Sequence, residues 1–141
     1  KVTKEAAQSI KKDAPTLSWV YLEYTDAIGH QFGHNPAFNK AIKIADKQVG
    51  LLHKAIQYRA KHFNEEWLLI ITTDHGRDKE TGKNHGGQSE SERTTWVASN
   101  QPNTNAHFKN GLAIVDIFPS VAQFLGLPID KHALDGVSFL E

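Results

Sequence analysis

The sequence predicts an α/β fold with a mostly parallel sheet covered by helices, forming a single domain over residues 1–141. Two observations support this fold class. Helix-like and strand-like segments alternate along the chain, and the strand-like segments are rich in apolar, β-branched and aromatic residues. A chain of 141 residues is also long enough to bury roughly two thirds of its unfolded surface.

The first half of the chain is expected to form a helix, a strand and a second, longer helix. The first helix runs from Thr3 to Lys12, with Thr3 as its N-cap and Pro15 marking its end. The run Leu17 to Tyr24 predicts a strand. Asn35-Pro36 then opens a helix that ends near Lys61. Its apolar positions recur every three or four residues and predict one buried stripe: Phe38, Ala41, Ile42, Ala45, Val49, Leu52 and Ile56.

The second half adds two strands, a polar loop and a closing helix. Trp67 to Thr73 is nearly continuous in apolar and β-branched residues, as a central strand buried on both faces should be. A polar loop with glycines occupies residues 76–93, and Thr94 to Ala98 predicts a third strand. A final helix is expected over Ile114 to Leu125, with Gly126 as its stop.

Composition excludes several classes of function. The 16 basic and 16 acidic residues cancel, which argues against a nucleic-acid-binding surface. No apolar run approaches the ~20 residues of a membrane span, so we expect a soluble chain without a membrane segment. The absence of cysteine excludes disulfides and thiolate metal sites. The chain begins at Lys1 and contains no methionine, so we expect a mature form or a fragment.

Carboxylate and imidazole groups follow two of the predicted strands. Asp26 and His30 follow the first, Asp74 and His75 follow the second, and His85 lies in a His-Gly-Gly soon afterwards. Ligand sites in open α/β sheets lie beyond the carboxyl ends of strands, so these side chains are expected to converge on one edge of the sheet. Oxygen and imidazole ligands together suit zinc, manganese or ferrous iron better than calcium or magnesium. A lone Asp-His after a strand is more often a capped turn, so the joint pattern carries the metal hypothesis.

Five ligands are too many for one tetrahedral zinc ion and too few for two well-filled sites, which favours a two-metal site with further ligands elsewhere. Arg77 and Lys83 are interpreted as solvated loop cations, with contact to substrate oxygens as the alternative. His107 and His132 lie in predicted loops and are assigned no role.

Three stretches resemble the alkaline phosphatase superfamily of metal-dependent phospho- and sulfo-transfer enzymes, in particular its nucleotide pyrophosphatase/phosphodiesterase branch. They are "TDAIGHQFGH", "TTDHG" and the tail "IVDIFPSVAQFLGLPIDKHALDGVSFL", and they occur in the family's order between Asp26 and Leu140. The resemblance implies a three-layer α/β/α fold, present here in part. This chain would then be the C-terminal metal-binding portion of a longer enzyme.

The resemblance also implies roles for single residues. Asp26 and His30 would bind one metal ion together with a later histidine, for which His85 is chosen over His34, and Asp74 and His75 would bind the other. The family's additional Asp and its Ser or Thr nucleophile have no matching position, so both are expected upstream of Lys1. The cofactors implied for the parent are two divalent ions, zinc first and manganese second.

The function expected of the parent is hydrolysis of a small-molecule phosphate ester, of the phosphodiesterase or phosphatase type. This chain alone is expected to be inactive, with the missing N-terminal part as its partner. Two alternatives stay open: a metal-dependent phosphomutase, because the mutase branches place a histidine as close to Asp-His-Gly as His85 lies, and a non-catalytic metal-binding domain. Periplasmic or extracellular placement is common in the family, whereas the mutase branches are cytoplasmic.

Overall fold

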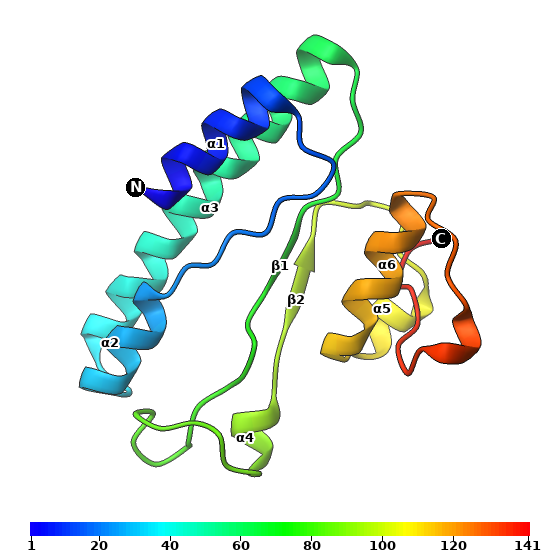
Figure 1. Cartoon of the computed structure of the whole chain (residues 1–141). Coiled ribbons are helices and arrows are strands. Elements are labelled where there is room, and N and C mark those ends of the chain that lie inside the picture. Colours follow the sequence, from blue (N-terminus) through cyan, green and yellow to red (C-terminus); the bar gives the residue numbers. More distant parts are fainter. The chain divides into compact units, whose positions relative to one another are not determined.

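The computed structural model describes the backbone of residues 1–141 and every side chain except that of Lys131 (Figure 1). The chain divides into two compact units, which we describe separately. The first comprises Lys1–Trp67 and Arg77–Glu92, and the second comprises Leu68–Gly76 and Arg93–Glu141. The expectation of one domain over residues 1–141 stays a prediction.

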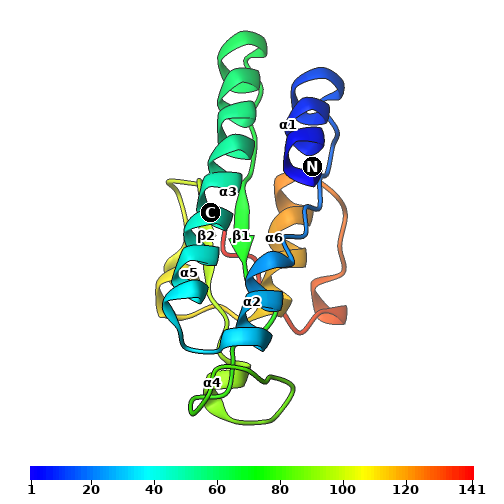
Figure 2. The ribbon, with the colours of Figure 1, turned by 90° about the vertical axis from the view of Figure 1, so that its left-hand side faces the viewer.

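Three helices form most of the first unit: α1 (Val2–Asp13), α2 (Tyr24–Phe32) and α3 (Pro36–Phe63). The views in Figures 1 and 2 show α1 beside α3, and the two helices are in contact. The expected start of α3 is confirmed, since the Asn35 side chain accepts a hydrogen bond from the Ala37 amide at 2.9 Å and Pro36 occupies the first turn. Thr3 is not the N-cap of α1. It lies inside the helix, where it is buried.

The core of the first unit lies along one side of α3. Ala41, Leu52 and Ile56 from the predicted stripe are buried there, together with Ala55. Ile42, which the periodicity assigned to the same stripe, is 47% exposed. Only part of the predicted stripe is therefore buried.

A buried arginine connects α3 to α1 and to the segment after α3. Arg59 is 7% exposed; its Nε and Nη2 both donate to the Glu65 carboxylate, and its Nη1 donates to the Lys11 carbonyl at 3.0 Å. Trp67 Nε1 donates to the same carboxylate at 2.9 Å, and the centre of the Phe63 ring lies 3.8 Å from the guanidinium carbon. The hydrogen bonds from Arg59, and then that from Trp67, lower the pKa of Glu65 to about 2.

The predicted strand at Leu17 to Tyr24 is wrong. Residues 17–22 form no regular element, and Tyr24 already belongs to α2. Leu17, Trp19 and Tyr21 are exposed, with Trp19 at 87%. β propensity reflects packing against neighbouring strands, and the described part of the first unit contains no strand with which this segment could pair.

The second unit contains a short antiparallel pair of strands, β1 (Ile70–Thr72) and β2 (Val97–Ser99), with Ile71 opposite Ala98. The strands expected at Trp67 to Thr73 and Thr94 to Ala98 thus exist over fewer residues. The pair is antiparallel, so it lends no support to a mostly parallel sheet. Two strands are too few to test the three-layer α/β/α arrangement, which stays a prediction.

The rest of the second unit is helical and is organised around a buried carboxylate. It contains α5 (Ala106–Asn110), η1 (Ile114–Asp116), α6 (Ile117–Phe124) and η2 (Lys131–Ala133). Of α4 (Glu90–Arg93), only the last residue, Arg93, belongs to this unit. The closing helix predicted at Ile114 to Leu125 is therefore confirmed as η1 followed by α6.

Asp116 is 3% exposed and accepts hydrogen bonds from the Ala113 amide, the Val137 amide and His107 Nε2, the last at 3.0 Å. Burial by itself raises the pKa of Asp116, but these hydrogen bonds outweigh it and the net shift is downward. His107, to which the sequence assigned no role, thus has a structural one. No local pattern indicates this contact, because Asp116 lies nine residues further on.

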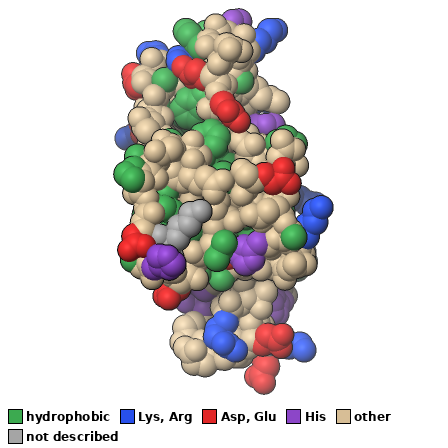
Figure 3. Space-filling view, turned by 90° about the vertical axis from the view of Figure 1, so that its right-hand side faces the viewer, with side chains coloured by type: hydrophobic (Ala, Val, Ile, Leu, Met, Phe, Trp, Pro, Cys, Tyr) green, Lys and Arg blue, Asp and Glu red, His purple; other side chains and the backbone are tan. Residues whose placement is uncertain are grey.

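Hydrophobic, acidic, basic and histidine side chains are interspersed on the face drawn in Figure 3. This mixture agrees with the formal net charge of zero. Among the described residues, none of the helices combines the length and the apolar character needed to span a lipid bilayer.

We expect Glu65→Gln to lower the Tm, because the buried guanidinium of Arg59 loses its counter-charge. The folded pKa of Glu65 is about 2 and the ordinary value is 4.5, so the stabilisation is fully present above about pH 4.5 and is lost as the pH falls toward 2. Thermal unfolding followed across this range should show the difference in Tm between the unchanged chain and the variant narrowing. The exposed neighbour Glu66 provides the control Glu66→Gln. A difference that does not depend on pH would contradict the prediction.

Candidate metal centre

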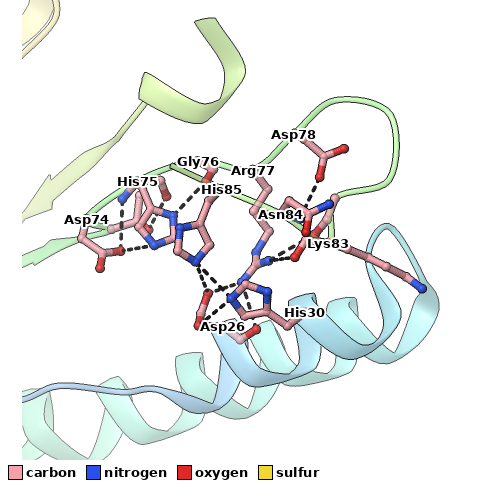
Figure 4. A network of polar contacts seen from close by, with 12 residues as sticks. Asp26, His30, Asp74, His75, Gly76, Arg77, Asp78, Lys83, Asn84 and His85 are labelled. Atoms are coloured by element: carbon pink, nitrogen blue, oxygen red, sulfur yellow. Dashed lines mark hydrogen bonds and ion pairs between the residues drawn. The ribbon is translucent and has the colours of Figure 1, made fainter. Parts of the chain in front are cut away.

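Three metal-ligating side chains meet in the first unit: Asp26, His30 and His85. His30 Nε2 lies 3.0 Å from His85 Nε2 and 3.4 Å from Asp26 Oδ2, and His85 Nε2 lies 3.6 Å from Asp26 Oδ1. Figure 4 shows these side chains directed toward one another. The structure therefore brings together three of the five ligands predicted from sequence, including a histidine 55 residues away from His30.

The Asp26, His30 and His85 side chains form a donor triangle of possible metal ligands, and its spacing is compatible with one zinc-like ion. In a tetrahedral shell with metal–ligand distances of about 2.0–2.1 Å, neighbouring ligand atoms lie roughly 3.3 Å apart. His30 Nε2 lies 3.0 Å from His85 Nε2 and 3.4 Å from Asp26 Oδ2, close to this value, while His85 Nε2 is 3.6 Å from the other carboxylate oxygen, Oδ1. Two imidazole nitrogens and one carboxylate oxygen are also the donor types that zinc prefers.

Helix α2 places two of the donors. Asp26 lies in its first turn and His30 in its last, and residues four apart occupy the same face of a helix. The predicted position of Asp26 at the end of a strand is wrong, because the segment before α2 forms no strand. The sheet-edge argument therefore does not explain why Asp26 and His30 meet. Their spacing on α2 does.

Arg77 holds the loop against α2 beneath these ligands. Its side chain is 10% exposed, and Nη2 donates to the Asp26 carboxylate and, at 2.9 Å, to the Asp26 carbonyl. Nη1 donates to the Gly82 and Lys83 carbonyls at 3.3 and 3.2 Å. The interpretation of Arg77 as a solvated cation is therefore wrong, because its N–H groups donate to protein oxygens. The alternative, contact with substrate oxygens, stays a prediction. Lys83 is exposed, and its carbonyl takes part in this contact.

The loop that follows Arg77 is organised by the carboxylate of Asp78. The Thr81 and Asn84 amides donate to it at 2.7 and 2.8 Å, and the Thr81 hydroxyl donates at 2.9 and 3.0 Å. The hydrogen bonds from the Thr81 and Asn84 amides hold the pKa of Asp78 well below its ordinary range. Sequence reasoning missed this residue, although an Asp that begins a polar loop with a Thr three residues later is typical of such a turn.

A second contact joins this loop to the end of α2. The Gly33 and His34 backbone approaches the loop, with the His34 amide donating to the Thr81 carbonyl at 3.0 Å. His34 Nε2 lies 3.2 Å from the Asp78 carbonyl, and a Cβ on Gly82 would lie 2.6 Å from His34 Nδ1. His34 is therefore outside the donor triangle and packs on the loop that carries His85. This agrees with choosing His85 over His34 as the third ligand.

On the other side of His85, the chain is fastened by Glu92. Its carboxylate accepts hydrogen bonds from the Gly87 amide at 2.9 Å and from the Ser89 hydroxyl. The hydrogen bond from Ser89, followed by that from Gly87, lowers the pKa of Glu92. His85 thus lies between two turns, each organised by a carboxylate.

Asp74 and His75 follow β1 in the second unit. His75 Nδ1 lies 2.8 Å from the Gly76 carbonyl, which can only accept, so we assign the ring proton to Nδ1. His75 Nε2 then has a lone pair and lies 3.5 Å from Asp74 Oδ1. A carbonyl that fixes the tautomer in this way is typical of metal-binding histidines. Asp74 and His75 therefore form a pair of ligand atoms within their own unit, and their assignment as ligands stays a prediction.

The Asp26, His30 and His85 cluster is a candidate metal centre, and comparison with known families identifies the class of protein. The family model described as "Type I phosphodiesterase / nucleotide pyrophosphatase" matches residues 1–122, which include all five predicted ligands. The chain therefore belongs to the type I phosphodiesterase/nucleotide pyrophosphatase family, within the alkaline phosphatase superfamily. This confirms the resemblance found in the sequence.

Similar curated proteins include GPI ethanolamine phosphate transferases of fungi. The chain is 30% identical over 127 residues to transferase 3 of Eremothecium gossypii, a match covering 77% of this chain and 12% of that protein. It is 30% identical over 122 residues to transferase 2 of Schizosaccharomyces pombe, covering 75% and 16%. It is 27% identical over 121 residues to transferase 2 of Candida albicans, covering 77% and 13%. The chain thus spans about an eighth to a sixth of the length of these relatives. No solved structure matches it significantly.

We expect Gly33→Ala to loosen the loop that carries His85. Gly33 has a φ of 62°, and a Cβ there would lie 2.0 Å from the Thr81 carbonyl oxygen. Gly126 has a φ of 64° with open space around its Cβ position, so Gly126→Ala is the matched control. Both substitutions place a side chain at a positive φ, but Gly33 also has a ψ of −145°, outside the left-handed helical region, and only Gly33→Ala adds a backbone clash. Thermal unfolding and limited proteolysis should show the larger loss of Tm and faster cleavage within residues 77–85 for Gly33→Ala. Equal losses of Tm would contradict the role of this contact.

Proposed function

We propose that the protein takes part in metal-dependent phosphoester chemistry and that Asp26, His30 and His85 hold one divalent ion. The observation that carries this proposal is the donor triangle, whose ligand atoms all lie within 4.8 Å of one another. The triangle lies within the residues that the phosphodiesterase family model matches. Zinc is proposed first and manganese second, because the donor set contains two imidazoles and a single carboxylate.

Asp74 and His75 are proposed to ligate a second divalent ion. The support is their place in "TTDHG", together with the hydrogen bond from His75 Nδ1, which puts the lone pair of the ring on Nε2. The further ligands that such a site needs are proposed to come from the rest of the whole protein. The matched relatives are much longer than this chain, which is consistent with that division.

The charges around the donor triangle favour an anionic substrate. With a divalent ion bound, the site keeps a net positive charge, because Asp26 is the only carboxylate of the triangle and neutral imidazoles add none. The guanidinium of Arg77 adds a further positive charge beside Asp26. A site of this sign attracts phosphate esters and stabilises the negative charge that develops during displacement at phosphorus.

For the whole protein we propose hydrolysis of a small-molecule phosphate ester. Bound divalent ions supply charge neutralisation and a lowered pKa for water. The residues described here bind and orient: α2 presents Asp26 and His30, the loop presents His85, and Arg77 fixes the carboxylate. The Ser or Thr nucleophile is proposed to lie outside these residues.

Transfer of the phosphoester group to an alcohol is a second candidate. It is favoured by the matched relatives, which are named GPI ethanolamine phosphate transferases. The same ligands serve both reactions, since the difference lies in whether water or a hydroxyl group accepts the phosphoryl group. The ratio of hydrolysed to transferred product, measured on the whole protein with an added alcohol, would separate the two.

The 141-residue chain is expected to bind one equivalent of zinc tightly. We expect His85→Ala to weaken this binding by about 100-fold or more, because loss of a ligand should cost at least as much as loss of a residue that only orients a ligand. Competition with a chromophoric chelator measures the affinity. His53→Ala, at an exposed position of α3, is the matched control and should leave the affinity unchanged. A folded chain that binds no zinc, or that binds it equally well without His85, would overturn the proposed site.

The zinc-loaded chain is expected to release no p-nitrophenolate from p-nitrophenyl phosphate or bis-p-nitrophenyl phosphate above a zinc blank. The reason is that the proposed nucleophile lies outside these residues. Turnover that is abolished by His75→Ala would contradict this assignment and would place the nucleophile within the chain.

A further inference from the structure

The guanidinium of Arg77 is bound on several sides by α2 and by its own loop. It donates to four oxygens: the Asp26 carboxylate and the carbonyls of Asp26, Gly82 and Lys83. Two of these acceptors belong to the residue that carries a proposed ligand, and the other two lie just before His85. One side chain therefore contacts both of the segments that supply the donor triangle.

Helix α2 is shaped to receive this guanidinium. A Cβ on Gly29 would lie 2.3 Å from Arg77 Cζ and 2.5 Å from its Nε, so the guanidinium rests where a side chain would otherwise stand. Gly29 is buried and lies one turn after Asp26. Its missing side chain thus allows Arg77 to approach α2 closely enough to reach both the carbonyl and the carboxylate of Asp26.

We propose that Arg77 is the positioning residue of the candidate metal centre. It binds Oδ1 of Asp26, which also lies 3.6 Å from His85 Nε2, while Oδ2 lies 3.4 Å from His30 Nε2. By donating at the same time to the Gly82 and Lys83 carbonyls, it sets the distance between α2 and His85. This inference rests on the proposed metal site and adds to it the group that fixes the carboxylate and the loop in register.

Charge alone predicts a different behaviour from positioning. A guanidinium next to a site for a divalent cation repels that cation, so a purely electrostatic role would make removal of the charge strengthen binding. It would also leave Lys equivalent to Arg. A positioning role depends on the planar fork of N–H donors, which a lysine ammonium does not reproduce. The charge-conserving substitution Arg77→Lys therefore separates the two.

The test uses two variants that keep all three proposed ligands, Arg77→Lys and Gly29→Ala. The new Cβ of Gly29→Ala meets the flexible end of Arg77, so it displaces the guanidinium while favouring the helical backbone by about 1 kcal/mol. The matched controls are Arg93→Lys, at an exposed arginine, and Gly50→Ala, a glycine of α3 with nothing within 4 Å of its Cβ position. Zinc affinity is measured by chelator competition, and circular dichroism confirms that each variant is folded.

We expect Arg77→Lys and Gly29→Ala each to weaken zinc binding by about 10- to 100-fold, as is typical of partners that orient metal ligands. Both controls should bind as the unchanged chain does. The double variant Arg77→Lys/His85→Ala should lose no more than His85→Ala alone, because Arg77 acts through the same site. The visible spectrum of the cobalt-substituted chain should also change in Arg77→Lys, which a role in overall stability would not cause.

The outcomes separate this inference from the proposed function. Absence of zinc binding in the unchanged chain overturns the metal site and the role of Arg77 together. Zinc binding that depends on His85 and is unchanged in Arg77→Lys and Gly29→Ala overturns the role of Arg77 alone. Unchanged affinity in Arg77→Lys with weaker binding in Gly29→Ala also overturns it, because the fork would then be dispensable.

Discussion

The contact between Arg77 and Asp26 is the interaction on which the candidate metal centre depends. It joins residues 51 positions apart, and the donor triangle exists only while the loop lies against α2. No ladder of strand hydrogen bonds holds these two segments together in the described part of the first unit. The entropy of closing the intervening chain must therefore be offset by a few contacts at one place. Because Arg77 also binds the Gly82 and Lys83 carbonyls, the same side chain orients Asp26 and holds the segment that carries His85.

The loop over residues 77–92 is held by its own hydrogen bonds, so it has little conformational entropy to lose when an ion binds. Asp78 ties the start of the loop to Thr81 and Asn84, and Glu92 ties the chain after His85 to Gly87. A ligand carried by a loop that is already ordered loses less conformational entropy when it binds an ion than one carried by a flexible segment. These two carboxylates act as hydrogen-bond acceptors within turns, so the pKa of each is lowered without either belonging to the donor triangle.

The helices could be predicted from sequence because their signals are local. Asn35 and Pro36 specify the start of α3, and the spacing of Asp26 and His30 places both on one face of α2. The strand at residues 17–24 could not be predicted correctly, because β propensity has meaning only when another strand is present. The role of Arg77 depends on a contact with a distant helix, which no local pattern reports. The available signal was a pair of glycines, Gly29 within α2 and Gly33 directly after it, since glycine in or beside a helix often marks a close approach of another segment.

A guanidinium beside a metal site has two opposite effects: it repels the bound ion, and it can orient a carboxylate ligand. The repulsion between a guanidinium and a divalent ion lowers affinity, most strongly where water is excluded. In this site the guanidinium and the ion would share one carboxylate: Arg77 binds Oδ1, which also lies 3.6 Å from His85 Nε2, and Oδ2 lies 3.4 Å from His30 Nε2. Asp26 is 32% exposed, so solvent moderates the repulsion, while Arg77 at 10% keeps its hydrogen bonds away from water. In the proposed site, Arg77 would lower the affinity for the ion somewhat and would fix the orientation of the Asp26 carboxylate. A fixed orientation matters more in a site that aligns an ion with a substrate than in a site that only stores the ion.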